Sequence, residues 1–358
     1  MSTPHVTSDD PVELLERLVE KPSVSGSEGP VIGFIDGQLR RWGFEPIVSG
    51  RNVWCRLDGA AGPGRTLLLE SHVDTVPAGP SWTVDPWRPR RFDGKLQGLG
   101  SNDTKGSTAG MLTALHNLLK RPDFKGTILF AATCDEETGG EGLEVLRPEL
   151  PAFDAAVIGE PTQLRIASAQ RGYLRMEVTC VGQSAHAARP WQGVNAIELA
   201  MDDLAAIRAI ETPDAHPVLG PTTRTISLIQ GGVKSNVVPP TCTYTVDIRP
   251  TPLYDNAWWE ERLRAVVKGR IDVMRARMVP VDTPTSDPLV QAGLAATSTE
   301  APVPFGGVSN LFFVRDLSGF VLGPGRPEQS HQADEWIEEE QVRASVAIYE
   351  DIARRYLV

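Results

Sequence analysis

TILFAATCDEETGGEG, residues 127–142, joins a short apolar run to three consecutive acids, Asp135, Glu136 and Glu137. The apolar part is typical of a buried strand. Adjacent carboxylates disfavour one another's ionisation, so acids at the end of a buried strand are costly unless a cation or a proton compensates them. A solvated acidic turn, which is common on acidic proteins, accounts for these residues equally well. The rest of the chain has to decide between the two interpretations.

Similar apolar runs recur on both sides of this stretch and alternate with helical segments. The expected strands are NVWCRLDG (52–59), TLLLESH (66–72), TILFAAT (127–133) and DAAVIGE (154–160). The expected helices cover residues 9–21, 29–43, 106–120 and 141–147, and the first has an Asp cap and Pro11 in its first turn. This alternation predicts an α/β fold in which a central sheet carries helices on both faces.

The sequence pattern changes after residue 170. In GYLRMEVTCVG (172–182) apolar and polar residues alternate, which is typical of a sheet with one covered face. Further strands are expected at RTISLIQGG (224–232) and TCTYTVDIR (241–249), with helices over about 193–210 and 256–271. We therefore expect an inserted α+β, ferredoxin-like domain over residues 170–281, in a four-strand and two-helix arrangement. The first domain then comprises residues 1–169 and 282–358, with a strand in FVLGPG (320–325) and a last helix over 338–356.

Composition excludes several classes of protein. The chain has 358 residues, which suits two globular domains, and its net charge of −11 argues against nucleic-acid binding. The polar N-terminus does not resemble a signal peptide, and no apolar run approaches the ~18 residues of a membrane span. Four widely spaced cysteines without a CxxC motif indicate free, buried thiols. We expect a cytoplasmic protein that does not bind membranes.

The strand TLLLESH leads into a His-x-Asp pair, His72 and Asp74. Residues two apart in a strand point to the same face, so the two side chains can meet. A histidine that binds a metal through one ring nitrogen usually donates the other N–H to a carboxylate, which fixes its tautomer. An ordinary turn containing both residues is the alternative.

Three other polar residues lie where apolar strands end or helices begin. Asp103 lies in a Gly-rich loop before a helix and could be only an N-cap, and the phosphate-loop motif GxxxxGK[ST] is absent there. Glu160 follows the strand in DAAVIGEPT and could belong to a simple turn. His331 lies in the loop LGPGRPEQSHQADEW and could be an exposed histidine.

In an α/β sheet the edge at which these residues fall is where ligands bind. His72, Asp103, Glu160, His331 and one of Glu136 and Glu137 would supply two imidazoles and three carboxylates. Such a set suits two divalent ions about 3.5 Å apart, one carboxylate bridging them, and zinc suits the mixed nitrogen and oxygen donors.

Five motifs of the chain resemble a known family in order and spacing. These are SHVDTVP (71–77), GSNDTKG (100–106), DEETGG (135–140), GEPT (159–162) and SHQADE (330–335). They are similar to the dinuclear-zinc family that includes acetylornithine deacetylase, succinyl-diaminopimelate desuccinylase, aminoacylase and glutamate carboxypeptidase. The resemblance spans nearly the whole chain. It implies a zinc-peptidase-like catalytic domain with an inserted lid and dimerisation domain, and therefore a homodimer.

The resemblance also implies a role for each motif residue. His72 and Glu160 would hold one zinc ion, Glu137 and His331 the other, and Asp103 would bridge them. Co²⁺ or Mn²⁺ could replace Zn²⁺. Asp74 would steady His72, and Glu136 would be the general base that takes a proton from the water held between the ions and passes it to the leaving amine. Asp135 has no role in this pattern beyond a structural one.

The inserted domain supplies the remaining implied residues. His186 would reach the partner subunit's active site and stabilise the oxyanion. Asn236 would contact the scissile carbonyl, and Arg249 would bind a substrate carboxylate. FGGVSNLFF (305–313) resembles the family's substrate loop through Gly306, Gly307 and Ser309, but Asn310 stands where the family usually has Asp. That departure leaves the substrate contacts of this loop open.

The expected activity is hydrolysis of the amide bond of a small N-acyl amino acid. The C-terminal motif LGPGRPEQSHQADEW resembles acetylornithine deacetylases more than desuccinylases, and the resemblance implies an N-acetylated basic or neutral amino acid of arginine or lysine metabolism. A dipeptidase, carboxypeptidase or desuccinylase of the same family is the alternative enzyme. A metal-free relative that only binds a ligand is the alternative of another class.

Overall fold

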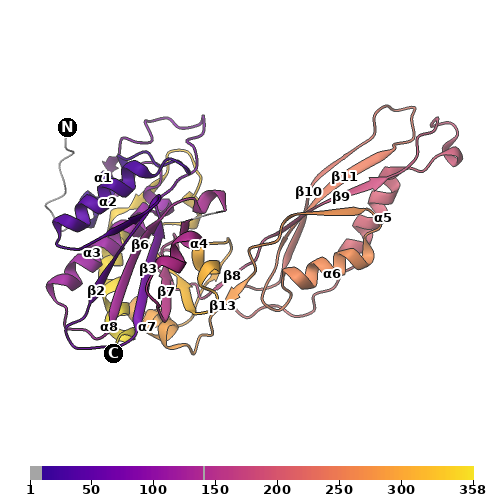
Figure 1. Cartoon of the computed structure of the whole chain (residues 1–358). Coiled ribbons are helices and arrows are strands. Elements are labelled where there is room, and N and C mark those ends of the chain that lie inside the picture. The colour runs from indigo at the N-terminus through magenta and orange to yellow at the C-terminus, as the bar shows by residue number, and fades with distance from the viewer. Residues whose placement is uncertain (1–9, 140–141) are drawn as a thin grey trace. The chain divides into compact units, whose positions relative to one another are not determined.

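The structure, a computed structural model, describes residues 10–139 and 142–358. The chain forms two compact units, each with its own hydrophobic core (Figure 1). The first unit contains the chain up to Ser168, Thr283–Val303 and Ser309–Val358. The second contains Ala169–Asp282 and Pro304–Val308.

A mixed sheet of six strands forms the centre of the first unit (Figure 1). In spatial order the strands are β1 (Ile47–Ser49), β2 (Asn52–Asp58), β6 (Thr127–Thr133), β3 (Thr66–His72), β7 (Ala155–Ile158) and β15 (Ser318–Val321). The last four are parallel to one another, whereas β2 is antiparallel to β6 and β1 to β2. Strands β3, β6 and β7 are almost wholly buried, which explains why their sequences do not alternate between apolar and polar residues.

Six α-helices of the described chain accompany this sheet. They are α1 (Pro11–Val19), α2 (Gly29–Arg41), α3 (Gly106–Lys120), α4 (Gly142–Leu146), α7 (Pro288–Thr297) and α8 (Glu339–Tyr356). Helices α1, α3 and α8 pack against one another, while α4 contacts β6 and α7 contacts β15. As expected, Asp10 caps α1 by accepting the N–H of Val12 at 3.1 Å, with Pro11 as the first helical residue. The expected helices over 9–21 and 141–147 include Asp9 and Glu141, which lie outside the described residues.

Short elements complete the first unit and hold the loops that follow the sheet. A second sheet contains β4 (Arg90–Phe92), β5 (Lys95–Gln97) and β16 (Trp336–Glu338), so that β16 fixes the chain shortly after His331. One π-helical turn is η1 (Ser101–Lys105). Short 3-10 turns are η2 (Glu136–Thr138), η3 (Arg147–Glu149), η5 (Asn310–Val314) and η6 (Pro327–Gln329).

The second unit has a four-stranded antiparallel sheet with two helices. The strands in spatial order are β10 (Thr223–Gly231), β11 (Thr241–Arg249), β9 (Leu174–Val181) and β12 (Arg270–Arg275), and the helices are α5 (Ala196–Arg208) and α6 (Asn256–Val266). The alternation expected for β9 is confirmed, since its apolar residues join the core beneath the helices. A turn, η4 (Pro190–Gln192), and a small sheet of β13 (Val281–Asp282), β8 (Ala169–Gln170) and β14 (Pro304–Phe305) complete this unit.

The helix expected over residues 256–271 begins where predicted but ends earlier. Helix α6 ends at Val266, and the residues that follow form the separate strand β12. The carboxylate of Asp203 accepts the N–H groups of Lys268 at 2.9 Å and Gly269 at 3.0 Å, which holds this segment out of the helix. At Gly269 an added Cβ would lie 2.6 Å from Val178, so the close approach to β9 also requires glycine.

Two further findings bear on the class of protein. Across residues 10–139 and 142–358, no helix combines the length and the apolar character needed to cross a membrane. All four cysteines are free and buried, as expected.

Candidate metal centre

The polar residues singled out in the sequence of the first unit meet at one edge of its central sheet. His72 is the last residue of β3, and the turn with Glu136 and Glu137 follows β6. Glu160 follows β7, and His331 follows β15. Because these four strands are parallel, their carboxyl ends lie together, and the five-residue turn η1 brings Asp103 to the same place.

One group of ligand atoms gathers around His72. Its Nε2 atom lies 3.3 Å from Oδ1 of Asp103 and 3.7 Å from Oε1 of Glu160. Ligand atoms of His72, Glu160 and Glu136 all lie within 4.8 Å of one another. His72 and Glu160 are buried, so this group is enclosed by the fold.

A second group gathers around His331, which is exposed. Its Nε2 atom lies 2.9 Å and 3.0 Å from the two carboxylate oxygens of Glu137 and 3.8 Å from Oδ2 of Asp103. Asp103 therefore presents one oxygen to His72 and the other to His331. It does not cap α3, whose N-cap position is Lys105, so the N-cap alternative is not what the structure has.

Asp74 connects the two acids of the η2 turn to His72. Its Oδ1 and Oδ2 atoms accept the N–H groups of Glu136 at 3.0 Å and Glu137 at 3.1 Å. Oδ1 also lies 3.3 Å from Nδ1 of His72, and Oδ2 accepts the hydroxyl of Ser25 at 2.7 Å. Burial alone would raise the pKa of Asp74, but these hydrogen bonds and the charge of His72 hold it below its usual value.

The centre carries more carboxylates than its two imidazoles can neutralise. Burial raises the pKa of Glu136 to about 8 and that of Glu160 well above its usual value, although His72 opposes both shifts. The hydrogen bond that His331 donates to the carboxylate of Glu137 raises the pKa of His331 to about 9. Burial lowers the pKa of His72, but Asp103, Asp74 and Glu160 together raise it well above its usual value. These shifts favour protonated side chains where no cation is bound, and the donor set of imidazoles and carboxylates fits divalent ions.

Glu335 is a buried acid that the sequence interpretation missed. Its carboxylate accepts the N–H groups of Gly100 at 2.9 Å, Asn102 at 2.7 Å and Asp103 at 3.0 Å, and so holds the loop that carries Asp103. Glu335 belongs to the same sequence motif as His331, SHQADE (330–335), so the motif could have pointed to it. The motif alone does not show that Glu335 contacts the loop of Asp103. Lys105 is buried and donates to the carbonyl oxygen of Lys21 at 3.0 Å, so it is not presented to a phosphate.

Asn310, the departure from the family pattern, has a partner inside the fold. Its side-chain amide donates to Oε1 of Glu70 at 2.8 Å, and Thr133 donates to the same oxygen at 2.5 Å. Glu70 is buried, and burial raises its pKa to about 6. Asn310 thus provides a hydrogen-bond donor to the buried carboxylate of Glu70. The neighbouring Ser309 is buried as well, and its hydroxyl accepts the N–H of Leu311 at 3.2 Å.

The second unit brings His186 and Asn236 together in two facing loops. Backbone pairing joins His186 to Val237, and the N–H of Ala187 donates to the carbonyl oxygen of Asn236 at 3.0 Å. Nδ1 of His186 accepts the N–H of Ala188 at 3.1 Å, which leaves Nε2 as the N–H donor of the neutral ring. Both His186 and Asn236 are exposed.

Arg249 lies elsewhere in the second unit, at the end of β11. Its guanidinium donates to Oδ1 of Asp247 at 2.8 Å and lies 4.1 Å from the centre of the Tyr173 ring. Gly306 and Gly307 also belong to this unit, and an added Cβ at Gly306 would meet nothing within 4 Å.

A pocket of about 270 Å³ opens beside His331 in the first unit. Its other lining residues are Val76, Pro77, Gly79, Ser81, Trp82, Leu99, Gln332 and Ala333. Apart from His331, none of the lining residues has a charged side chain, so that imidazole is the one titratable group that the pocket lining offers.

Known proteins share both the sequence pattern and the fold of this chain. The model of peptidase family M20/M25/M40 matches residues 68–355. The acetylornithine deacetylase of Erwinia tasmaniensis is 31% identical in an alignment of 364 positions that covers 91% of this chain and 92% of the relative. That of Salmonella paratyphi B is 32% identical in an alignment of 365 positions, with the same coverage.

Solved structures agree on the fold. A metallo-carboxypeptidase of the M20 family from Sulfolobus solfataricus has a TM-score of 0.77 at 16% identity, covering 98% of this chain and 99% of that chain. A dinuclear metal-binding M20 peptidase from Bacillus subtilis has a TM-score of 0.72 at 14% identity, covering 97% of each chain. The chain therefore belongs to peptidase family M20/M25/M40. The expected fold and the expected class, a metal-dependent hydrolase, are confirmed.

Proposed function

We propose that this protein removes an N-acyl group, in the first place an N-acetyl group, from an amino acid, using two divalent metal ions. The observation that carries the proposal is the position of Asp103, whose two oxygens face the imidazoles of His72 and His331. A shared carboxylate between two nitrogen donors is what a dinuclear centre requires. The deacetylases at 31% and 32% identity, aligned over nearly their whole length, support the substrate class.

In this proposal His72 and Glu160 hold one ion, Glu137 and His331 the other, and Asp103 both. When bound, the ions would polarise the amide carbonyl and lower the pKa of the attacking water. Zn²⁺ is favoured by the mixed nitrogen and oxygen donors, and Co²⁺ or Mn²⁺ are the substitutes to test.

Glu136 is the proposed general base. It belongs to the group of ligand atoms around His72, but the ions have enough donors without it. Its carboxylate would take the proton of the attacking water and give it to the leaving nitrogen. Asp74 supports this role because it holds the N–H of Glu136 and orients His72 through Nδ1.

The second unit would supply the substrate contacts. With Nδ1 already bonded to Ala188, Nε2–H of His186 is available to donate to an oxyanion, and Asn236 lies beside it. Arg249 would bind the substrate α-carboxylate with the donors that Asp247 does not use. Gly306 and Gly307, with Ser309 of the first unit, are the proposed substrate loop. The first unit would also supply the pocket that His331 lines, which is the proposed site of the acyl group.

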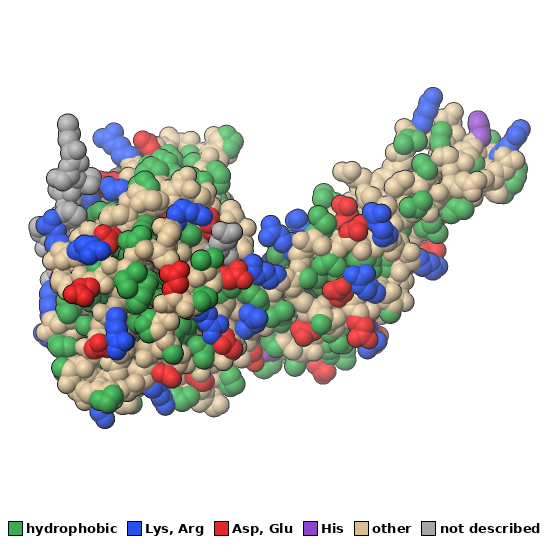
Figure 2. Space-filling model, viewed as in Figure 1, with side chains coloured by type: hydrophobic (Ala, Val, Ile, Leu, Met, Phe, Trp, Pro, Cys, Tyr) green, Lys and Arg blue, Asp and Glu red, His purple; other side chains and the backbone are tan. Residues whose placement is uncertain are grey.

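We propose that the protein is a cytoplasmic homodimer assembled through the second unit, with His186 serving the partner subunit. Strand β10 is an edge strand and its apolar residues Leu228 and Ile229 are 61% and 52% exposed. An exposed apolar edge strand is a template for pairing with a second copy. Hydrophobic side chains are visible on this unit in Figure 2. Four free cysteines fit a reducing compartment.

A substrate panel tests the proposed reaction. Protein loaded with Zn²⁺ would be assayed with N-acetylornithine, neutral N-acetyl amino acids, N-succinyl amino acids and dipeptides, with Glu136→Gln as the blank. Hydrolysis of N-acetyl amino acids with the largest kcat/KM supports the proposal. A preference for dipeptides would make the protein a peptidase of the same family, and a wild type no faster than Glu136→Gln would refute an enzymatic role.

A further inference from the structure

The η2 turn with Glu136 and Glu137 begins at Asp135, a residue with an unusual backbone. Asp135 has φ 56° and ψ 19°, in the left-handed region, which Asp adopts at a lower cost than most side chains. This single residue redirects the chain from the end of β6 toward the metal centre. The directions of Glu136 and Glu137 therefore depend on how firmly Asp135 is held.

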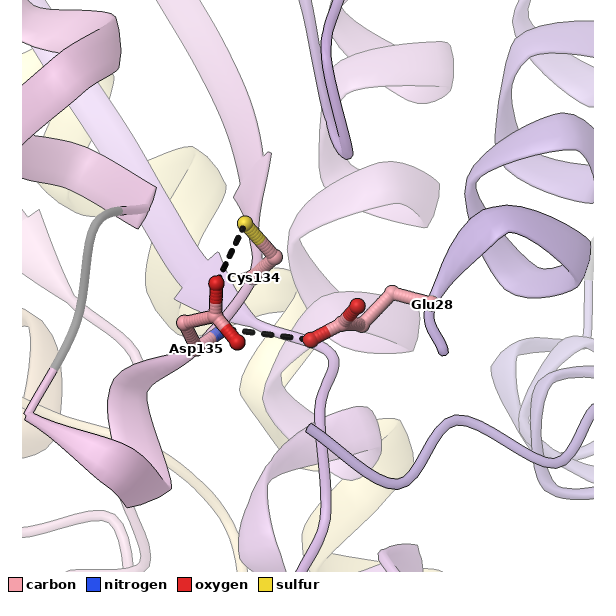
Figure 3. A group of neighbouring side chains, drawn as sticks. All are labelled: Glu28, Cys134 and Asp135. Carbon is pink, nitrogen blue, oxygen red and sulfur yellow. Dashed lines mark hydrogen bonds between the residues drawn. The ribbon is translucent and has the colours of Figure 1, made fainter. Parts of the chain in front are cut away.

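Four consecutive backbone N–H groups in this segment are bound by side chains. The N–H of Cys134 donates to Oδ1 of Asn52 at 3.0 Å, and that of Asp135 to Oε1 of Glu28 at 3.3 Å. The next two, of Glu136 and Glu137, donate to the carboxylate of Asp74. Figure 3 shows Glu28 reaching the backbone nitrogen of Asp135 from a different part of the fold.

Arg51 links the side chains of Glu28 and Asp135. Its guanidinium donates to Oε2 of Glu28 and to both carboxylate oxygens of Asp135, one of them at 3.0 Å. Glu28 is fully buried and the side chain of Asp135 is 12% exposed, so neither acid can be stabilised by water alone. Arg51 belongs to the tight turn between β1 and β2, next to Asn52.

This cluster is not a third metal position. Ligand atoms of Glu28, Cys134 and Asp135 lie within 4.8 Å of one another (Figure 3), a spacing that a metal ion could use. Arg51 already supplies the cation to both carboxylates, however, and burial raises the pKa of the Cys134 thiol to about 12. A thiol binds metals as the thiolate, and a neutral thiol does not. The cation of this cluster is therefore the guanidinium of Arg51 and not a metal ion.

We propose that Arg51 and Asp135 are positioning residues for the hydrolytic reaction, and that with Glu28 they fix the turn that directs Glu136 and Glu137 toward the two groups of ligands. This inference rests on the proposed function of those two acids. The guanidinium of Arg51 donates its hydrogen bonds to Glu28 and Asp135. It acts through Asp135, whose carboxylate accepts from Arg51 and whose N–H donates to Glu28.

The test compares Arg51→Gln, Arg51→Lys and Asp135→Asn with wild type. Arg56→Gln is the matched control, because Arg56 lies in β2 and pairs with exposed Asp58. For each protein we would measure kcat and KM at saturating Zn²⁺, the affinity for Zn²⁺ by titration, and the melting temperature. Asn suits position 135 because it tolerates a left-handed backbone.

We expect Arg51→Gln and Asp135→Asn to lower kcat by ~10- to 100-fold with KM changed by less than about two-fold, and to weaken Zn²⁺ binding by ~10-fold or more. Arg51→Lys should recover part of kcat, since it keeps the charge but not the planar fork. Arg56→Gln should match wild type. If Arg51→Gln does not fold, Asp135→Asn and Arg51→Lys carry the test.

The proposal is overturned if Asp135→Asn and Arg51→Gln melt at lower temperature but retain wild-type kcat per folded molecule and wild-type Zn²⁺ affinity. That outcome would make the cluster a purely structural ion pair. If wild type hydrolyses none of the substrates, the proposed function fails instead. The Zn²⁺ affinities of the variants would still decide whether Arg51 and Asp135 position the turn.

Discussion

Nδ1 of His72 lies 3.3 Å from Oδ1 of Asp74, and both side chains are buried. Asp74 also binds the N–H groups of two consecutive acids. We predict that Asp74→Asn lowers kcat by ~10- to 100-fold and weakens metal binding, because an amide nitrogen would face a backbone N–H. Steady-state kinetics and metal titration check this, with Asp36→Asn, a half-buried acid that pairs with Arg40 on α2, as the control. Wild-type values for Asp74→Asn would show that Asp74 is dispensable.

Glu136 and Glu137 are neighbours in the chain but belong to different groups of ligand atoms. We expect Glu136→Gln to retain bound metal and lose ~10² to 10⁴ in kcat, as removal of a general base does. Glu137→Gln should instead lose metal, because it removes a donor beside His331. Elemental analysis of both purified variants measures the difference, and equal metal loss in the two would contradict the assigned roles.

The metal-free protein should become less stable as the pH rises. Glu136, with a pKa raised by burial to about 8, binds a proton when folded that it releases on unfolding above about pH 4.5. His331, raised to about 9 by Glu137, does the same above about pH 6.5. The folded state thus holds more protons, so stability falls with pH between about 4.5 and 7; above pH 7 the buried Lys105, whose pKa burial lowers to about 7, acts in the opposite direction. Melting curves of chelated protein would test this, and a rise in melting temperature over that range would contradict it. Saturating Zn²⁺ should remove the trend, since the ions replace these protons.

We predict that Asp203 contributes to the free energy of unfolding and not to the hydrolytic reaction. Asp203→Ala removes the acceptor for the N–H groups of Lys268 and Gly269, which should cost about 1 to 3 kcal/mol or more of unfolding free energy. Urea unfolding measures the loss, and Asp202→Ala, an exposed neighbour on α5, is the matched control. Equal stability of the two variants would refute the explanation given for the end of α6.

A charge on the edge strand β10 should prevent dimer formation. Ile229→Lys places a cation on an exposed apolar edge, which disfavours pairing with a second copy. Light scattering should give a dimer mass for wild type and a monomer mass for the variant. Val145→Lys, at a 50% exposed position of the first unit, should leave the mass unchanged. A monomeric wild type would exclude the dimer.

Much of the centre could be predicted because its residues follow strand ends. The carboxyl ends of parallel strands meet at one edge, so His72, Glu137 and Glu160 are brought together by topology. The role of Asn310, which stands where the family usually has Asp, could not be predicted from the sequence, because its partner Glu70 lies 240 positions away.

Other features depend on contacts that leave no local pattern. The residues around Arg51 and Glu28 give no indication that both side chains contact Asp135, because the three residues come from separate parts of the chain. The end of α6 was misplaced for a similar reason. Its helical pattern continues past Val266, but Asp203 on another helix binds the backbone of the next residues.

The number of metal ions bound per chain tests the central claim most directly. Chelated protein would be titrated with Zn²⁺ by calorimetry while hydrolysis of an N-acetyl amino acid is followed on the same samples, with Asp103→Ala in parallel. We predict two ions per wild-type chain, activity restored as they bind, and loss of both binding and activity in Asp103→Ala. A wild-type chain that binds no Zn²⁺, or hydrolyses its substrate equally well after chelation, would contradict the account.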